Sequence, residues 1–166
     1  MEALLGEVVE VDARTEILWS TVRLTDLGEE SLRDAPDQVA VLGKTRSGAV
    51  FAADINAGVA PEDVQFTLEI RGSEGWLRLM NDHPYGFQAG DFKLTSNVTL
   101  EAPEEAAVSG GLMGAAINVG EVYTQLVRDV HAGTYATPGF EHAVHNARLI
   151  EATRRAAERG QRQTVC

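Results

Sequence analysis

The clearest candidates for ligand chemistry are two polar residues, Asp54 and Asn56, within residues 49–57. The positions that alternate with them are all apolar. Because successive side chains of a strand point to opposite faces, a strand here places both polar groups opposite Phe51 and Ile55. Carboxylate and amide groups readily form hydrogen bonds with the polar groups of a ligand. The pattern therefore has two interpretations, a solvent-facing strand end or one border of a substrate cleft.

His83 and Tyr85, on either side of Pro84, are a second candidate for ligand contact. The run from Asn81 to Pro84 is equally typical of an ordinary turn, so both interpretations stay open. His142 and His145 have the spacing of neighbours on a helix, but a metal site needs a third ligand that nothing nearby supplies. We predict two exposed helix histidines there rather than a metal site.

The sequence lacks the common signatures of catalysis and of cofactor binding. It contains no G-x-G-x-x-G dinucleotide loop, no G-x-x-x-x-G-K phosphate loop and no G-x-S-x-G nucleophile motif. Cys166 is the only cysteine, so it has no disulfide partner within the chain. We therefore assign no catalytic, cofactor-binding or metal-ligating residue to this chain.

Composition and charge argue against several classes of partner. Lys and Arg number 14 against 25 Asp and Glu, which gives a net charge of −11 and makes attraction to a phosphate backbone unfavourable. No apolar run approaches the roughly 20 residues of a membrane span, and no segment resembles a secretory signal. We predict a cytoplasmic protein that binds neither nucleic acid nor membrane.

Hydrophobic periodicity predicts strands first and helices after them. Residues 39–42 and 49–57 flank a polar loop of hairpin length and are predicted to pair antiparallel. Residues 64–71 alternate between apolar and polar side chains, and Gly72-Ser73-Glu74-Gly75 is predicted to turn the chain into a strand over 76–80. Further strands are predicted at residues 8–13, 17–24, 92–95 and 98–100.

Two helices are predicted in the C-terminal part. The first covers residues 116–132 and ends at Gly133; the second is capped by Thr137, has Pro138 in its first turn and ends at Gly160. Residues 101–114 are predicted to form a loop. The predicted buried stripe of the second helix is Phe140, Val144, Ala147, Ile150 and Ala157.

These elements predict one α+β domain over residues 1–166, a mainly antiparallel open-faced β-sheet with helices packed on one face. If the strands alternate, Val9, Val41, Phe51 and Trp76 cannot all lie under the helices. The open face is therefore predicted to carry apolar surface and to form a homodimer. The alternative is a polar, solvated face.

Residues 6–13 (Gly-Glu-Val-Val-Glu-Val-Asp-Ala), 71–77 and 138–152, taken in order, resemble the C-terminal domain of the Gfo/Idh/MocA family of nicotinamide-dependent sugar and polyol oxidoreductases. The resemblance implies that an N-terminal Rossmann domain with a catalytic lysine, and an Asp-x-x-x-His pair, precede this segment in the parent enzyme. It implies NAD or NADP in that parent and no cofactor in this chain. It also implies a sugar or polyol substrate, and a second subunit against the open sheet face.

Three functions follow from these observations. The first is the C-terminal domain of a sugar or polyol oxidoreductase, truncated and inactive alone, that contributes a subunit interface and a substrate cleft bordered by Asp54, Asn56, His83 and Tyr85. The second is a free-standing module for sheet-mediated dimerisation or ligand binding, without catalysis. The third is a small enzyme such as an isomerase that uses Asp54 or His83, which requires a pocket closed by this chain alone.

Overall fold

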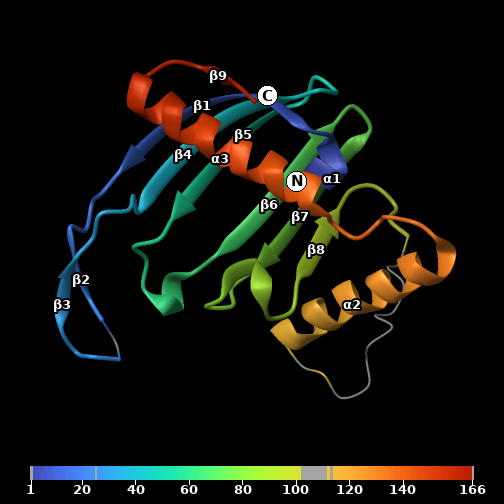
Figure 1. Cartoon of the computed structure of the whole chain (residues 1–166), viewed down its shortest axis with the longest axis horizontal. Helices are drawn as coiled ribbons and strands as arrows, with labels where there is room; N and C mark the ends of the chain where they lie inside the picture. Colours follow the sequence, from blue (N-terminus) through green and yellow to red (C-terminus); the bar gives the residue numbers. More distant parts are fainter. Residues whose placement is uncertain (1, 25, 102–111, 113, 166) are drawn as a thin grey trace. The chain divides into compact units, whose positions relative to one another are not determined.

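The computed structural model describes residues 2–24, 26–101, 112 and 114–165, so the predicted loop over 101–114 lies mostly outside the described residues. Every strand pair that it describes is antiparallel, which confirms the predicted sheet type and the α+β class. The elements are drawn in Figure 1. In chain order they are α1 (Glu2–Leu5), β1 (Val8–Glu16), β2 (Thr21–Arg23), β3 (Glu30–Leu32), β4 (Gln38–Thr45), β5 (Val50–Asn56), η1 (Pro61–Asp63), β6 (Phe66–Gly72), β7 (Gly75–Asn81), η2 (Gly86–Gln88), β8 (Lys93–Ser96), α2 (Ala115–Ala132), α3 (Phe140–Arg159) and β9 (Gln163–Thr164).

The chain forms two compact units. The first unit, Met1–Gly58 with Gly139–Cys166, holds a four-stranded sheet in the order β5-β4-β1-β9, the two-stranded β2-β3 ribbon, α1 and α3. The second unit, Val59–Pro138, holds the three-stranded sheet β6-β7-β8 and α2. No helix in the described residues is long and apolar enough to cross a bilayer.

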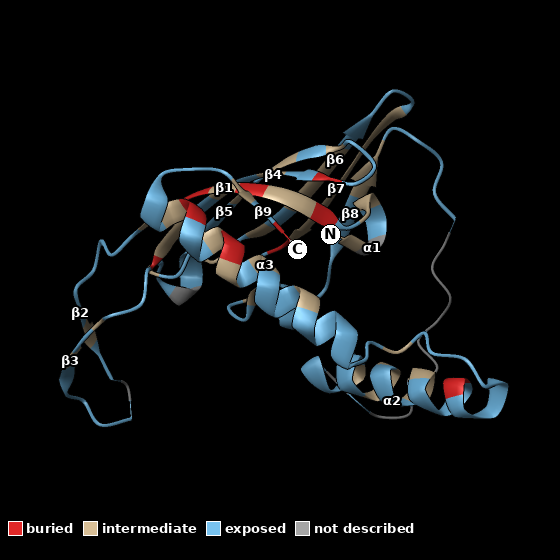
Figure 2. Ribbon diagram, turned by 45° about the horizontal axis from the view of Figure 1, so that its top comes forward, coloured by how far each residue is buried: buried red, intermediate tan, exposed pale blue. Residues whose placement is uncertain are grey.

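The core of the first unit lies between α3 and the middle of the sheet. Val8 and Val11 of β1 are fully buried, and they form one cluster with Ala152 of α3 and Val165. Figure 2 shows the buried residues of this unit concentrated on β1 and on the side of α3 that faces it. The small Ala152 and Ala156 allow the helix to approach the strands closely, so a compact helix-on-sheet layer results.

Two local features of the sheet bring large side chains to the α3 side. A register shift between Val8 and Glu10 lets Val8 and Val11, which are three positions apart, both face the core. Gly43 lies beside Phe51 on the neighbouring strand, and a Cβ at Gly43 would come within 2.3 Å of the Phe51 ring. The absence of a side chain at Gly43 therefore gives Phe51 its place over β4.

The predicted stripe of α3 is wrong by roughly half a turn of the helix. Phe140 is 93% exposed and Ile150 is 71% exposed, whereas Leu149, Ala152 and Ala156 face the sheet. Sequence periodicity favoured the bulkier apolar residues, but the close approach of helix and sheet selects the small ones. The end of α3 at Gly160 is confirmed, because Gly160 has φ +59° and its N–H bonds to the carbonyl of Ala156.

The predicted strand over 17–24 is present only at Thr21–Arg23, where it pairs with β3 in a ribbon that is separate from the main sheet. Asp37, which is fully buried, holds the base of this ribbon. Its carboxylate accepts hydrogen bonds from the N–H groups of Leu18 and Trp19, at 2.8 and 2.9 Å. These hydrogen bonds bend the backbone just after β1, and the pairing of β1 with β4 therefore ends at Glu16.

The sheet of the second unit confirms the predicted hairpin at residues 64–80. Gly72 and Gly75 pair across a two-residue turn, and β6 then runs in register with β7. The predicted strand over 98–100 is wrong, because β8 ends at Ser96. The Ser96 hydroxyl both accepts from the N–H of Val98 at 2.9 Å and donates to its carbonyl at 2.7 Å, which bends the chain out of the sheet.

The α2 helix ends as predicted, at Gly133 with φ +68°. The residues of its predicted apolar stripe from Val119 to Val130 remain exposed, from 45% at Leu126 to 73% at Val130. Asp129, in the last turn of α2, holds the segment that follows the helix. The carboxylate of Asp129 accepts hydrogen bonds from the hydroxyls of Thr134 and Thr137 and from the N–H of Thr137, each at 2.7 Å. Thr137 is therefore not the cap of α3, which begins at Phe140 after Gly139.

Candidate functional site

The open face of the four-stranded sheet carries the first predicted pair of site residues. Phe51 and Val41 pack against the core cluster on the α3 side, so the alternate residues of β5, including Asp54 and Asn56, project from the other face. Both residues are exposed. In the sheet register Asp54 lies opposite Ala40 of β4, which in turn lies opposite Arg14 of β1. The predicted alternation of this strand is thus present.

Two adjacent hollows run along these strands, with volumes of about 580 and 540 Å³. They share Asp12, Leu42 and Ala52, and Asp54 borders the second one. The floor is made of small apolar groups, and charged side chains lie around it. Such a surface suits either a flat hydroxyl-rich ligand or another protein surface.

The charges around these hollows are mixed in sign. Glu10 forms an ion pair with Arg162 at 3.1 Å. Among the described residues, no ion pair reaches the side chains of Asp12, Arg14, Lys44 and Asp54. These four groups are available to hydroxyls or to charges of opposite sign on a partner.

The apolar surface of this open face is smaller than the sequence suggested. Leu42 is 62% exposed and Val50 is 79% exposed, while Val41 and Phe51 lie on the α3 side. Charged side chains on the same face of the sheet surround Leu42 and Val50. The face is therefore an apolar strip with a charged border, intermediate between the two interpretations.

His83 and Tyr85 lie in the second unit, in the segment that follows β7. The N–H of His83 donates to the Asn81 side chain at 2.6 Å, and the N–H of Tyr85 donates to His83 Nδ1 at 3.1 Å. Asn81 is buried and its amide group donates to the carbonyl of Ala89 at 2.7 Å. The geometry is that of a side-chain-stabilised turn. Asp54 and Asn56 share a strand of one unit, and His83 and Tyr85 share a turn of the other.

Two buried carboxylates that the sequence patterns did not predict, Asp37 and Asp129, each hold a loop in place. The Leu18 N–H, followed by the Trp19 N–H and Arg33, outweighs burial and lowers the pKa of Asp37 below its ordinary value. The Thr137 hydroxyl, then the Thr137 N–H and the Thr134 hydroxyl, does the same for the pKa of Asp129. Both groups therefore stay ionised in mild acid. The threonines that follow Asp129 were the only available signal.

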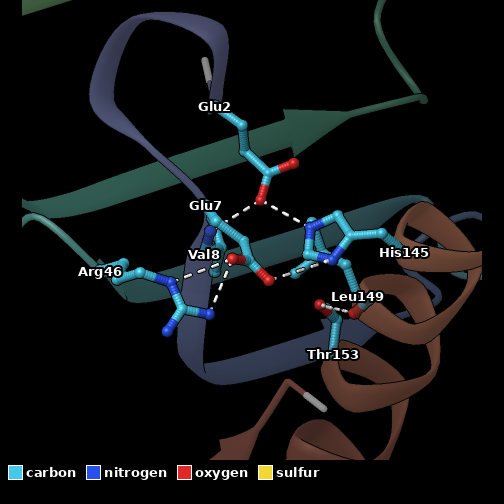
Figure 3. A network of polar contacts seen from close by, with 7 residues as sticks. All are labelled: Glu2, Glu7, Val8, Arg46, His145, Leu149 and Thr153. Atoms are coloured by element: carbon cyan, nitrogen blue, oxygen red, sulfur yellow. Dashed lines mark hydrogen bonds and ion pairs between the residues drawn. The ribbon is translucent and has the colours of Figure 1, made fainter. Parts of the chain in front are cut away.

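A third polar cluster joins α1, the β4–β5 turn and α3 (Figure 3). Glu2 Oε1 lies 2.8 Å from Nε2 of His145 and accepts the N–H of Val8 at 2.7 Å. Glu7 Oε1 lies 3.7 Å from the other ring nitrogen of His145, and Glu7 Oε2 accepts two hydrogen bonds from Arg46. The prediction of two exposed histidines is thus wrong for His145, whose side chain is only 22% exposed.

The described residues hold no cluster of metal-ligating side chains. No group of three or more His, Cys, Asp or Glu side chains among them is arranged to hold a metal ion. A dinucleotide loop connects a strand directly to a helix N-terminus, whereas α3 follows α2 and Gly139 with no strand between them. The N-terminus of α3 therefore lacks the strand-to-helix connection of a dinucleotide-binding loop.

The chain matches solved structures over almost its whole length. Levoglucosan dehydrogenase in complex with NADH matches 99% of it with a TM-score of 0.69 and 17% identity. The WlbA dehydrogenase from Chromobacterium violaceum, in complex with NADH and UDP-GlcNAcA, matches 100% with a TM-score of 0.63 and 20% identity. The super-repressor mutant of Gal80p from Saccharomyces cerevisiae matches 95% with a TM-score of 0.69 and 16% identity.

This chain has the fold of one part of each of these proteins. It spans 46% of levoglucosan dehydrogenase, 42% of WlbA and 44% of Gal80p. The fold class implied by the Gfo/Idh/MocA resemblance is thereby confirmed. No protein-family model and no curated protein sequence matches the chain.

Proposed function

We propose that this chain is the C-terminal domain of an NAD(P)-dependent sugar or polyol oxidoreductase of the Gfo/Idh/MocA type. The observation that carries the proposal is the match of the whole chain to less than half of dehydrogenases that bind NADH. In this proposal the dinucleotide and the catalytic lysine belong to an N-terminal Rossmann domain outside residues 1–166. This chain is inactive alone and contributes substrate contacts and a subunit interface.

The substrate contacts are assigned to Asp54 and Asn56, with His83 and Tyr85 as further candidates. A carboxylate and an amide on one strand face offer several acceptors and two donors to vicinal hydroxyls. Asp54 borders a hollow of about 540 Å³, which is large enough for a monosaccharide. The names of the matched structures support this substrate class, since they include complexes with L-sorbose and with UDP-GlcNAcA.

The subunit interface is assigned to the same open face of the sheet. A homodimer about a twofold axis brings this face against itself, so the strip around Leu42 becomes buried. The unpaired Arg14 and Asp54 then find partners of opposite sign on the second copy. The two assignments compete for Asp54, and the variants proposed in the Discussion decide between them.

The test is an assay of the full-length gene product for reduction of NAD and NADP with a panel of sugars and polyols. We expect reduction of one nucleotide with at least one substrate. The control is the chain of residues 1–166 alone, for which calorimetry should give no dissociation constant below about 10 μM, or about −7 kcal/mol. A gene product without a dinucleotide-binding domain would overturn the proposal, as would tight nucleotide binding by this chain alone.

The second candidate is a module for dimerisation or ligand binding without catalysis. The match to Gal80p favours it, because that structure is described as a super-repressor rather than a dehydrogenase. Such a module would dimerise through the same face, but its full-length form would reduce neither nucleotide. The same assay therefore separates the two candidates.

A further inference from the structure

The β2–β3 ribbon lies apart from the four-stranded sheet of the first unit (Figures 1 and 2). Its strands pair at three positions, from Thr21 opposite Leu32 to Arg23 opposite Glu30. An isolated two-stranded ribbon is only marginally stable in water, and a further surface that packs against it stabilises it. Leu32 is 82% exposed, and Leu27 near the tip is 65% exposed. The ribbon therefore offers apolar side chains to another surface.

The base of the ribbon is held firmly, so the ribbon has a defined direction. The buried Asp37 carboxylate accepts the N–H groups of Leu18 and Trp19, and it lies 3.1 Å from the Arg33 guanidinium. The N–H of Arg33 also donates to the carbonyl of Ser20 at 2.9 Å. A ribbon fixed in this way loses little conformational entropy when it docks, which favours its use in a contact.

The ribbon is acidic. Residues 21–32 contain one cation, Arg23, and three exposed carboxylates, those of Asp26, Glu29 and Glu30. Arg23 lies opposite Glu30 in the register, so these two opposite charges are neighbours. In the described part of the chain no ion pair involves Asp26 or Glu29. The tip of the ribbon therefore keeps two carboxylates for a cationic partner.

Positive charge gathers on one face of the β6-β7-β8 sheet in the second unit. Residues 59–138 hold four Lys and Arg against eleven Asp and Glu. The strand register nevertheless places three of these four cations on one face of the sheet, namely Arg71, Arg78 and Lys93. Glu69, opposite Arg78, is the only acidic residue in the three strands. The face thus has a net charge of +2 within a unit of net charge −7.

Glu69 and Trp76 hold the two arginines of this face in place. Glu69 accepts hydrogen bonds from Nε of Arg71 and, at 2.7 Å, from Nε of Arg78. The Arg78 guanidinium lies 5.9 Å from the centre of the Trp76 ring. The Arg78 side chain, followed by that of Arg71, outweighs burial and lowers the pKa of Glu69, so Glu69 stays ionised. Fixed arginines beside a tryptophan are typical of the centre of a protein–protein contact.

We propose that the acidic β2–β3 ribbon of one copy of this chain docks on the basic face of the β6-β7-β8 sheet of a second copy. The dimensions agree, because three strands span about 10 Å and so do three residue pairs of a ribbon. In the contact Asp26 and Glu29 pair with Arg71 and Lys93, and the leucines cover Trp76. A twofold axis makes two such contacts in one dimer.

This contact is separate from the subunit interface proposed above. It uses neither Leu42 nor the two hollows of the open face, so each contact can fail without the other. The two contacts also differ in character. The open-face strip is mainly apolar, whereas the ribbon contact is held largely by opposite charges, which salt screens.

The test is the self-association of the chain in a Leu42→Lys background, which disrupts the open-face contact. Sedimentation equilibrium should detect a dimer with a dissociation constant of roughly 10 to 100 μM at low salt. Between about 0.05 and 0.5 M salt we expect this constant to rise at least about tenfold. A chain that stays monomeric up to about 1 mM at low salt would overturn the ribbon contact and leave the open-face interface untouched.

A charge swap then tests which two surfaces meet. D26K/E29K reverses the ribbon, and R71E/K93E reverses the sheet face without removing Glu69, Arg78 or Trp76. Each variant alone should associate at least about tenfold more weakly, because like charges then face each other. In an equimolar mixture the two reversed surfaces attract each other and the two unchanged surfaces form the second contact. The mixture should therefore return to within about threefold of the parent.

The control for net charge is E62K/D63K, which changes two exposed carboxylates outside both surfaces and should not alter the association. A mixture that associates no better than either reversed variant would overturn the proposal, since the basic face would then bind something other than the ribbon.

A second measurement keeps the proposal testable if a reversed variant folds poorly. The chain has two tryptophans, so Trp19→Phe leaves Trp76 as the only fluorescent one. Its emission should change as the chain associates, and D26N/E29Q should move that change to higher concentration. The Asn side chain still accepts the Leu27 N–H that Asp26 binds at 3.0 Å, so the tip keeps its turn. A Trp76 emission that does not depend on concentration would overturn the contact.

Discussion

The two faces of the four-stranded sheet in the first unit carry very different side chains. On the α3 side Val8 and Val11 are fully buried with Ala152. On the other side Leu42 and Val50 of the same sheet are 62% and 79% exposed among charged neighbours. The α3 side is covered within this chain around Val8 and Val11, while Leu42 and Val50 on the open face have no cover within it. The fold is thus determined by one face, and the function proposed above depends on the other.

The largest effect should separate the two faces by their contribution to stability. Val11→Ala removes two methyl groups from a fully buried site, and we expect it to lower the free energy of unfolding by about 2 kcal/mol. Val50→Ala is the matched control on the open face and should change it by less than about 0.5 kcal/mol. Urea denaturation of both variants measures the difference. Equal losses would mean that the open face is already covered by a partner.

A second contrast concerns carboxylates. The pKa of Asp37 is lowered chiefly by the Leu18 N–H, so its ionised form stabilises the fold above its ordinary pKa of about 4, and this stability is lost as the pH falls further. We expect Asp37→Asn to lower the melting temperature at pH 7 and to flatten its fall in acid. Asp54→Asn, on the open face, should leave the melting temperature at pH 7 unchanged. If the melting temperature of Asp37→Asn still falls in acid as it does in the wild type, groups other than Asp37 cause that fall.

Some features of this fold can be predicted from patterns in the sequence, and others cannot. The hairpin of β4 and β5 follows from two apolar runs on either side of a polar, Gly-containing loop, and Gly133 and Gly160 end their helices because each adopts positive φ. The buried stripe of α3 does not follow, because the packing distance to β1 selected Ala152 and Ala156 over Phe140 and Ile150. Periodicity reports which residues share a helix face but not which face a sheet will cover.

The contacts within the polar clusters could not be predicted from the sequence for another reason. Glu2 and His145 lie 143 positions apart, so only the folded chain brings their side chains together. Asp37 and Asp129 resemble any loop or helix carboxylate until the N–H groups around them are placed. For the candidate site, the strand parity of Asp54 and Asn56 was predictable from alternation. Its relation to His83 and Tyr85 was not, because those residues belong to a different unit.

The third prediction tests the open face as a subunit interface. Leu42→Lys places a charge in the middle of the apolar strip, beside Asp12 in the sheet register, so the fold should tolerate it. We expect the dimer dissociation constant to rise at least about tenfold, the change that 1.4 kcal/mol produces. Light scattering over a wide concentration range measures it. Ile55→Lys is the control, since Ile55 is 56% exposed but has the opposite strand parity.

The outcome of that comparison is informative in either direction. If the wild-type protein stays monomeric at every concentration, the interface proposal is wrong, and the charged side chains around the apolar strip would then serve ligand binding. Equal weakening by the two lysine substitutions would show that association does not use the open face.

The smallest expected effect decides what Asp54 and Asn56 do. In the full-length protein, replacement of both by Ala should raise the Michaelis constant for the sugar several-fold if they border the substrate cleft. The fold should be little affected, because exposed polar groups contribute little stability. If they instead belong to the subunit interface, the Michaelis constant stays unchanged and the dimer dissociation constant rises, because Arg14 of the second copy loses its carboxylate partner. Asp34→Ala, an exposed carboxylate between β3 and β4 that borders neither hollow, is the matched control. A double variant with wild-type kinetics and wild-type association would leave both residues as a solvent-facing strand end.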